Sequence, residues 1–270
     1  MIVEYHRPES LEQAVELLER QQPQTVPMGG GTVLSRARKP DVAVVDLQRL
    51  GLNKIVQEGQ LLRIGAAVTL QALLESAEAK NMLPLEAKNV LPEEIPDSIG
   101  AALADSLRHE AGLNIRQTAT VAGALASCDG RSPFATALLA LDPRLAWAPG
   151  EEGQPLGDFL PLREAFGGGR LIVDVRVPLN ATLRFAMVAR TPMDRPVVCA
   201  AVATWPSGRT RVTLGGHGPA PILAMDGPEA GGAVVAAREA YRFAEDAWAS
   251  AAYRMEIAAR LVQRMIRGDA

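Results

Sequence analysis

Apolar positions recur along this chain with two different periods, and each period predicts a kind of element. Residues 11–18 place apolar side chains at helical spacing, and Ser10 with Gln13 forms a capping box at the start of this helix. Thr69 predicts the cap of a second short helix that runs to Leu74. Three apolar runs predict strands, at 25–27, 42–47 and 61–68. The first quarter of the chain therefore predicts a small α/β unit.

The second half of the chain has a different pattern. Pro and Gly separate four strand-like stretches, at 171–177, 184–190, 197–205 and 209–215. This spacing predicts an antiparallel meander. The tail from Glu229 has helical periodicity, and we place Trp248 and Tyr253 in its helix. Residues 134–141 fit either a helix or a buried strand, and 148–158 predict a surface turn cluster. Together the segments predict an α+β fold in three consecutive parts.

Charge and hydropathy exclude several classes of protein. The chain has 28 Lys and Arg against 31 Asp and Glu, a net charge of −3. A nucleic-acid-binding protein would need a basic face, so we expect no nucleic-acid partner. No run of about 18 apolar residues occurs, which predicts no membrane span. The N-terminal sequence has no apolar signal-peptide core, so we expect a cytoplasmic protein.

Cysteine and histidine are too few for a metal centre. The chain has two cysteines, Cys128 and Cys199, and 3 histidines spread along its length. An iron–sulfur cluster normally takes four thiolates, and a structural zinc site needs clustered Cys and His. We therefore expect no metal site and two free thiols. Any redox chemistry would need an organic cofactor.

Two segments carry residues that suit a phosphate-containing ligand. Gly29-Gly30-Gly31-Thr32 follows a predicted strand, and its backbone N–H groups could approach an anion closely. A simple tight turn is the alternative, since the loop is neither a Walker loop nor a GxGxxG motif. In the segment 114–125, Thr118 and Thr120 could present hydroxyls, and Gly123 permits close backbone approach. The alternative for that segment is a strand and turn whose small residues only pack.

Taken together, in this order and at this distance along the chain, the two segments indicate a particular protein family. Both belong to a longer series of motifs, which is PMGGGTVL at 27–34, KPDVAVVDLQRL at 39–50, LLRIGAAVTLQALLE at 61–75, NIRQTATVAGALAS at 114–127 and a closing helix at 249–266. With these motifs the chain resembles the FAD-binding (medium) subunit of the molybdenum hydroxylases. Carbon monoxide dehydrogenase and xanthine dehydrogenase represent that family.

The resemblance implies a fold and a set of contacts to the cofactor. The fold would be a two-subdomain PCMH-type FAD-binding fold followed by a C-terminal α+β domain of antiparallel sheet and helices. Its parts would span 1–55, 56–165 and 166–270. The residues implied to bind FAD are Pro27, Met28, Gly29, Gly30, Gly31, Thr32, Val33, Leu34, Ala111, Gly112, Thr120, Gly123, Ala124 and Asp129. The resemblance implies no catalytic acid or base.

The resemblance also implies a function as an electron-transfer subunit. Such a subunit takes electrons from partner [2Fe–2S] clusters and passes them through FAD to NAD, oxygen or a quinone. The implied partners are a large molybdenum-cofactor subunit and a small [2Fe–2S] subunit, in a heterotrimer that can dimerise. A stand-alone FAD oxidase would usually carry a larger substrate domain than this chain has.

Three positions depart from the family pattern. Ala124 and Pro133 stand where an asparagine and an aspartate are usual, and Gln117 replaces another asparagine. Losing polar groups that bond a cofactor weakens its binding. These departures leave open a second hypothesis, a degenerate homologue that has lost flavin and serves as a structural or assembly module.

Overall fold

The computed structural model describes residues 1–34, 41–78, 99–150, 153–163 and 168–268. The chain divides into two compact units. The first unit comprises residues 1–73, 113–127 and 143–177, and the second comprises residues 74–112, 128–142 and 178–270. Each unit is built from segments distant in sequence, so neither could form from one continuous stretch of chain.

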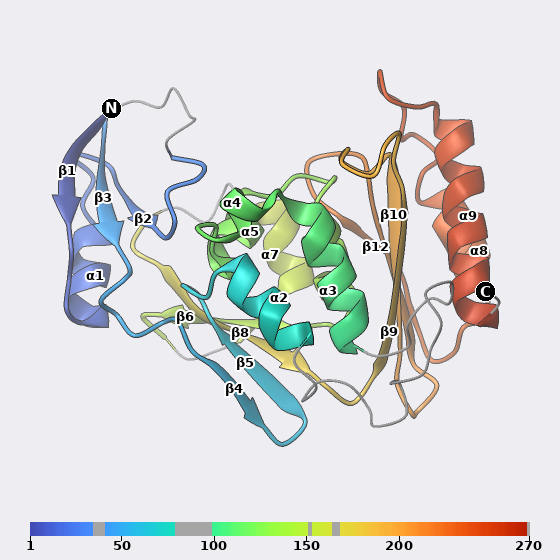
Figure 1. Cartoon of the computed structure of the whole chain (residues 1–270), viewed down its shortest axis with the longest axis horizontal. Helices are drawn as coiled ribbons and strands as arrows, with labels where there is room; N and C mark the ends of the chain where they lie inside the picture. The colour runs from blue at the N-terminus through green and yellow to red at the C-terminus, as the bar shows by residue number, and fades with distance from the viewer. Residues whose placement is uncertain (35–40, 79–98, 151–152, 164–167, 269–270) are drawn as a thin grey trace. The chain divides into compact units, whose positions relative to one another are not determined.

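A three-stranded parallel sheet begins the first unit. Its order is β1 (Ile2–His6), β3 (Val42–Asp46) and β2 (Thr25–Met28), and β3 is buried throughout because it is the central strand. Helix α1 (Leu11–Leu18) packs its buried side chains on β2 and β3 (Figure 1). The Ser10 hydroxyl accepts from the Gln13 N–H at 3.3 Å, which confirms the predicted cap.

The rest of the first unit is a five-stranded sheet with short helices. The strand order is β4 (Ile55–Glu58), β5 (Leu61–Gly65), β8 (Leu171–Pro178), β6 (Arg144–Ala148) and β7 (Gln154–Pro155). The helices are α4 (Leu113–Arg116), α5 (Val121–Ser127) and α7 (Leu156–Leu162). Helix α2 (Leu70–Glu78) begins in this unit and ends in the second, and the Thr69 hydroxyl accepts from the Ala72 N–H at 3.1 Å, as predicted.

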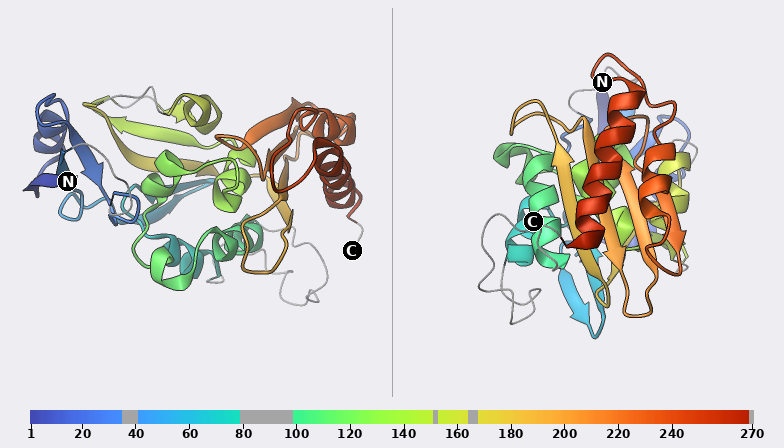
Figure 2. Two further views of the ribbon diagram at one scale, coloured as in Figure 1. Left: turned by 90° about the horizontal axis from the view of Figure 1, so that it is seen from above. Right: turned by 90° about the vertical axis from the view of Figure 1, so that its right-hand side faces the viewer.

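The second unit has three layers, with an antiparallel sheet between two layers of helices. The strand order is β12 (Ile222–Gly227), β11 (Thr210–Gly215), β10 (Val198–Thr204) and β9 (Thr182–Val188). Helices α3 (Ile99–Glu110) and α6 (Pro133–Ala140) pack on one face, and α8 (Ala233–Glu239) and α9 (Ala251–Arg267) pack on the other (Figures 1 and 2). Both faces of β10 are buried because helices cover both sides.

The predicted α+β fold class is confirmed, with several local corrections. The sequence pattern places strand β8 in the C-terminal meander, but β8 pairs with β6 in the five-stranded sheet. The fourth strand of the meander is β12 instead. The segment predicted at 134–141 is a helix, α6, and the stretch 148–158 contains β7 and the start of α7 rather than turns alone. Trp248 lies before the Ser250 cap of α9, not within the helix. The three-part division at residues 55 and 165 stays a prediction.

Three further predictions concern the segment 76–98, membrane spans and the cysteines. Residues 76–98 are rich in Pro, Glu and Lys, which predicts short helical pieces joined by turns. Beyond Glu78 this stretch lies outside the described residues. Among the described residues, no helix is long and apolar enough to cross a membrane. Cys128 and Cys199 are both buried, and no disulfide joins them.

Candidate functional site

The glycine loop begins where β2 ends, at the carboxyl edge of the parallel sheet. Met28 pairs with Asp46 across β2 and β3, and the Leu47 N–H donates to the Met28 carbonyl at 3.2 Å. Asp46 is buried, and Tyr5, Arg7 and the Gln48 N–H all bind its carboxylate. The ends of β2 and β3 therefore fix the base of the loop. The Arg7 guanidinium neutralises the charge of the Asp46 carboxylate beside it.

The loop is wedged against the second sequence segment. A Cβ on Gly29 would lie 2.5 Å from the Thr120 Oγ1, and one on Gly30 would overlap the Thr118 carbonyl oxygen. Gly31 has φ of +68°, a conformation that other residues adopt only with strain. Glycine is therefore required by close approach at two positions and by backbone conformation at the third. The structure brings together two segments that are about 90 residues apart.

The same loop leaves its backbone donors unused. Within the part of the chain that the structure describes, the N–H groups of Gly29, Gly30, Gly31 and Thr32 donate no hydrogen bond. Successive free N–H groups in a glycine loop form a concave site for an anion such as phosphate. Glycines at this position let the backbone approach the ligand without a side chain between them. This cradle fits the pyrophosphate of a dinucleotide.

The second segment is helical rather than a strand and turn. The first amides of α5 are already bonded: Val121 donates to the Val68 carbonyl at 2.8 Å and Ala122 to the Ala66 carbonyl at 3.2 Å. The Gly123 N–H donates to the Thr120 Oγ1 at 3.2 Å. Thr120 therefore caps α5 and supports Gly29 at the same time, and its hydroxyl still has a proton to donate. The Thr118 hydroxyl instead donates to the Ile115 carbonyl at 3.2 Å, within its own turn.

The remaining residues predicted to bind the cofactor fall in different places. Ala124 lies on α5 in the first unit, whereas Ala111, Gly112 and Asp129 belong to the second unit. Arg195 donates to Asp129 with both terminal nitrogens, one of them at 2.9 Å. Burial alone would raise the pKa of Asp129, but the bonds from Arg195 and the Arg131 N–H hold it below its ordinary value. In this structure, the Asp129 carboxylate binds the Arg195 guanidinium and the Arg131 N–H.

Sequence reasoning missed one carboxyl group in this region. Glu110 ends α3, and its Oε2 accepts from the Ser132 hydroxyl at 2.8 Å and from the Phe134 N–H at 3.0 Å. Burial raises the pKa of Glu110 above its ordinary value. Glu110 thus holds the first turn of α6 from a neighbouring helix. In the sequence Glu110 follows Arg108 and His109, a charged run that is typical of a solvated helix face, so the sequence carries no signal of this contact.

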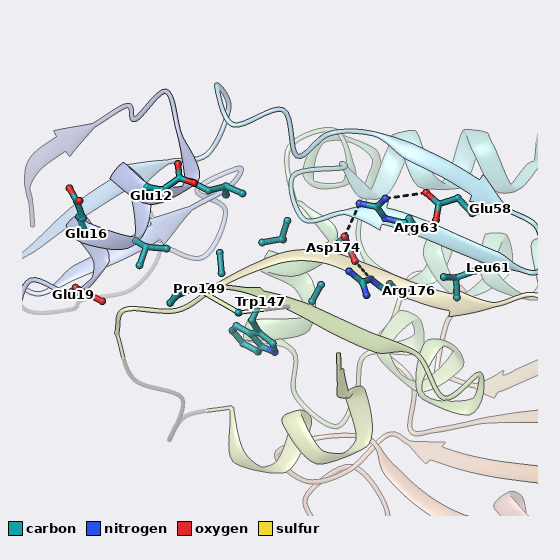
Figure 3. Close-up of a pocket in the computed structure, with 16 residues that line it drawn as sticks. Glu12, Glu16, Glu19, Glu58, Leu61, Arg63, Trp147, Pro149, Asp174 and Arg176 are labelled. Atoms are coloured by element: carbon teal, nitrogen blue, oxygen red, sulfur yellow. Dashed lines mark hydrogen bonds and ion pairs between the residues drawn. The ribbon is translucent and has the colours of Figure 1, made fainter. Parts of the chain in front are cut away.

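A separate cavity of about 850 Å³ lies in the first unit, and it does not fit a dinucleotide (Figure 3). Five carboxylates line it, from Glu12, Glu16, Glu19, Glu58 and Asp174. Against them stand only two guanidinium groups, and both bind Asp174. A ligand with two phosphates would meet net negative charge there, which is unfavourable. None of the residues predicted to bind FAD lines this cavity.

Comparison with known proteins identifies the family. Residues 1–180 match the family described as the FAD binding domain in molybdopterin dehydrogenase. The chain belongs to this family. Its cofactor is FAD, and it is the flavoprotein part of an oxidoreductase. The family match includes the glycine loop and the segment that packs against it.

Solved structures share the fold across nearly the whole chain. Reconstituted CO dehydrogenase from Oligotropha carboxidovorans has a TM-score of 0.76 at 23% identity and covers 98% of this chain and 96% of its own. Quinoline 2-oxidoreductase from Pseudomonas putida 86 has a TM-score of 0.74 at 22% identity, with coverage of 99% and 96%. An uncharacterised Escherichia coli K12 protein, YgfM, is 29% identical over 220 residues, which are 80% of this chain and 75% of that protein.

Proposed function

We propose that this chain is the FAD-binding electron-transfer subunit of a molybdenum hydroxylase. It takes electrons from partner [2Fe–2S] clusters and passes them to an external acceptor. The observation that carries the proposal is the row of N–H groups at Gly29–Thr32, which bond no group within the described residues and pack against Thr118 and Thr120 in an FAD-binding domain.

The residues of the chain bind and orient the cofactor. Residues 27–34 hold the pyrophosphate through backbone N–H groups, and Thr120 keeps the loop in place from the side. Gly123, Ala124, Ala111, Gly112 and Asp129 complete the proposed set. FAD, when bound, supplies the reversible acceptance of electrons that no side chain offers. The protein needs no acid or base for this task.

The metal centres belong to partner subunits in this proposal. A [2Fe–2S] cluster normally takes four thiolates, and the chain has two cysteines. The partners are a molybdenum-cofactor large subunit and a [2Fe–2S] small subunit, assembled as a heterotrimer in the cytoplasm. The large subunit selects the substrate.

A spectroscopic titration with a matched variant tests the cofactor site. The purified chain should show the two visible flavin bands, or acquire them with excess FAD, and release FAD on denaturation. Gly30→Ala should weaken FAD binding at least tenfold, because its methyl group would displace the loop from Thr118. Gly227→Ala is the control, since its Cβ would meet only ordinary contacts at 3.5 Å and beyond.

One observation favours the alternative of a structural module without flavin. Ala124 and Pro133 lack the polar groups usual in the family, and the Gly123 N–H is already bonded within its own turn. A colourless chain that shows no FAD binding by titration or by thermal shift would establish this alternative and overturn the electron-transfer function. Restoring Asn at 124 and Asp at 133 would then show which departure is responsible.

A further inference from the structure

The cavity of about 850 Å³ in the first unit contains none of the residues predicted to bind FAD, and helix α1 forms one of its walls (Figure 3). Residues of β4, β5, β6 and β8 form the other wall. Apolar side chains line much of the space, among them Leu11, Val15, Leu61 and Pro149. Sites for small organic molecules are concave, partly apolar and about 300–1,000 Å³ in volume. The cavity therefore has the size and the lining of such a site.

The charges on the sheet wall of the cavity cancel one another. Asp174 is buried, and its carboxylate pairs with Arg63 at 3.2 Å and with Arg176 at 3.0 Å. The Glu58 carboxylate pairs with Arg63 at 3.1 Å. Two carboxylates and two guanidinium groups therefore lie together on this wall, as Figure 3 shows, and they leave it without net charge.

The charges on the helix wall are not compensated. Glu12, Glu16 and Glu19 all line the cavity, and none of their carboxylates forms an ion pair with another residue that the structure describes. Elsewhere in the unit such pairs do form, as between Glu4 and Arg20 at 2.8 Å. The last turn of α1 has no basic residue, so the negative end of the helix dipole adds to the charge of Glu16 and Glu19. This wall therefore attracts a cation.

The spacing of the three glutamates indicates the form of that cation. Residues three and four apart share one face of a helix, with Cβ atoms about 5–6 Å apart. The carboxylates of α1 therefore form a row rather than converging on one point, and no group of Asp, Glu, His or Cys that could hold a metal ion occurs in the described part of the chain. Ammonium groups joined by short methylene chains match such a row. Their methylenes also suit the apolar lining, which a compact metal ion would leave uncovered.

We propose that this cavity binds an aliphatic polyamine. Its ammonium groups pair with the carboxylates along α1, and its methylene chain covers the apolar side chains between the two walls. Indole rings also attract cations, but the Trp147 ring already has the Arg170 guanidinium carbon 4.9 Å from its centre, so the ligand charges go to the glutamates. Binding through exposed carboxylates is screened by salt, so the affinity should fall as ionic strength rises. The proposal does not rest on FAD binding, because the two sites share no residue.

Isothermal titration calorimetry of the full chain with spermidine, at fixed ionic strength, tests the site. The double variant Glu16→Gln with Glu19→Gln should raise the spermidine Kd tenfold or more, while its Tm should not fall because both side chains are exposed. The matched control is Glu239→Gln with Glu245→Gln, which removes the same charge from exposed positions of the second unit and should leave the Kd unchanged. Butylamine, with one ammonium group, should bind the wild type at least tenfold more weakly than spermidine.

Several outcomes would overturn the polyamine site. Spermidine that does not bind the wild type, or an unchanged Kd in the cavity variant, would do so directly. An equal rise of the Kd in the control variant, or equally tight binding of Mg²⁺, would mean that net charge alone explains the binding. Oligolysine that binds these glutamates more tightly than spermidine would show that the occupant is a basic protein segment, contrary to the proposal. A chain that binds spermidine but no FAD would overturn the proposed function and leave this site standing.

Discussion

Thr120 supports both helix α5 and the proposed cofactor loop through one hydroxyl. Its Oγ1 accepts the Gly123 N–H at 3.2 Å and lies at the position a Gly29 side chain would need. The residue is buried, so its methyl group also packs in the unit. The hydroxyl and the packing can be separated because valine keeps the shape of threonine without its oxygen, and serine keeps the oxygen.

We expect Thr120→Val to lower the free energy of unfolding by about 1 kcal/mol, the usual cost of losing a helix cap. Thr120→Ser should retain most of that stability because the cap bond remains. Urea unfolding of the FAD-free chain measures both variants. Equal stability of Thr120→Val and the wild type would show that the bond to Gly123 does not stabilise α5.

The half-buried carboxyl of Glu110 links protonation to folding. Burial raises its pKa above the ordinary value of 4.5, although the Phe134 N–H, the Ser132 hydroxyl and the charge of Arg195 act in the opposite direction. Asp129 adds a further negative charge nearby. A folded-state pKa above the unfolded value means that the folded state binds the proton more tightly. The stabilisation is full below pH 4.5 and is lost as pH rises through the raised pKa.

Glu110→Gln should remove this dependence. The amide oxygen can still accept from Ser132 and Phe134, but it does not ionise. We therefore expect the variant to gain stability relative to the wild type as pH rises above 4.5, with a limiting slope of about 1.4 kcal/mol per pH unit. Denaturant unfolding across pH 4 to 8 measures the difference. A difference that is flat with pH would contradict the argument.

At the scale of elements, a buried cation adds to the apolar face that packs α9 into its unit. Arg254 sits on the helix face that meets β10, and its guanidinium binds Asp246 and three carbonyl oxygens. Those bonds tie the segment 244–249 to the sheet before the helix starts. The Asp246 pKa lies well below its ordinary value, because the bonds from Arg254 and two backbone N–H groups outweigh the effect of burial.

Arg254→Met should therefore destabilise the chain by about 3–5 kcal/mol, since it leaves Asp246 in a poorly solvated place without its main partner. Arg267→Met, in the exposed last turn of the same helix, should change stability by less than about 0.5 kcal/mol. Thermal and urea unfolding of both variants provide the comparison. A loss below about 1 kcal/mol for Arg254→Met would mean that the network contributes little.

Local elements were predictable from the sequence, but their partners were not. The capping box at Ser10 and the cap at Thr69 lie within a few residues of the helices they start, so their signals are complete in the sequence. The sequence of β8 fits a strand in a meander as well as a strand in another sheet, because strand pairing depends on distant segments. The sequence pattern predicts neither edge strand β1 nor β4, because their residues are mostly exposed and leave no continuous apolar run.

At the scale of the whole molecule, the site depends on contacts that no local pattern contains. The glycine run marked the loop, but by itself it left a simple tight turn as the alternative. The contact of Gly30 with Thr118 joins segments separated by α2 and α3, and only the resemblance of both motifs to one family predicted that they act together. The bond between Asp129 and Arg195 could not be predicted, because an aspartate in a loop fits many roles.

The cradle at Gly29–Thr32 offers N–H donors to phosphates, so the chain should be stabilised by flavins in proportion to their phosphates. At 100 times its Kd, FAD should raise the free energy of unfolding by about 2.7 kcal/mol. Riboflavin has the same ring system but no phosphate, and at the same concentration it should stabilise far less, with FMN between them. Thermal shift measures all three ligands. Gly30→Ala should bring the FAD response down toward that of riboflavin, because the displaced loop no longer aligns its donors. Equal stabilisation by riboflavin and FAD would mean that the ring, and not the loop, supplies the binding energy.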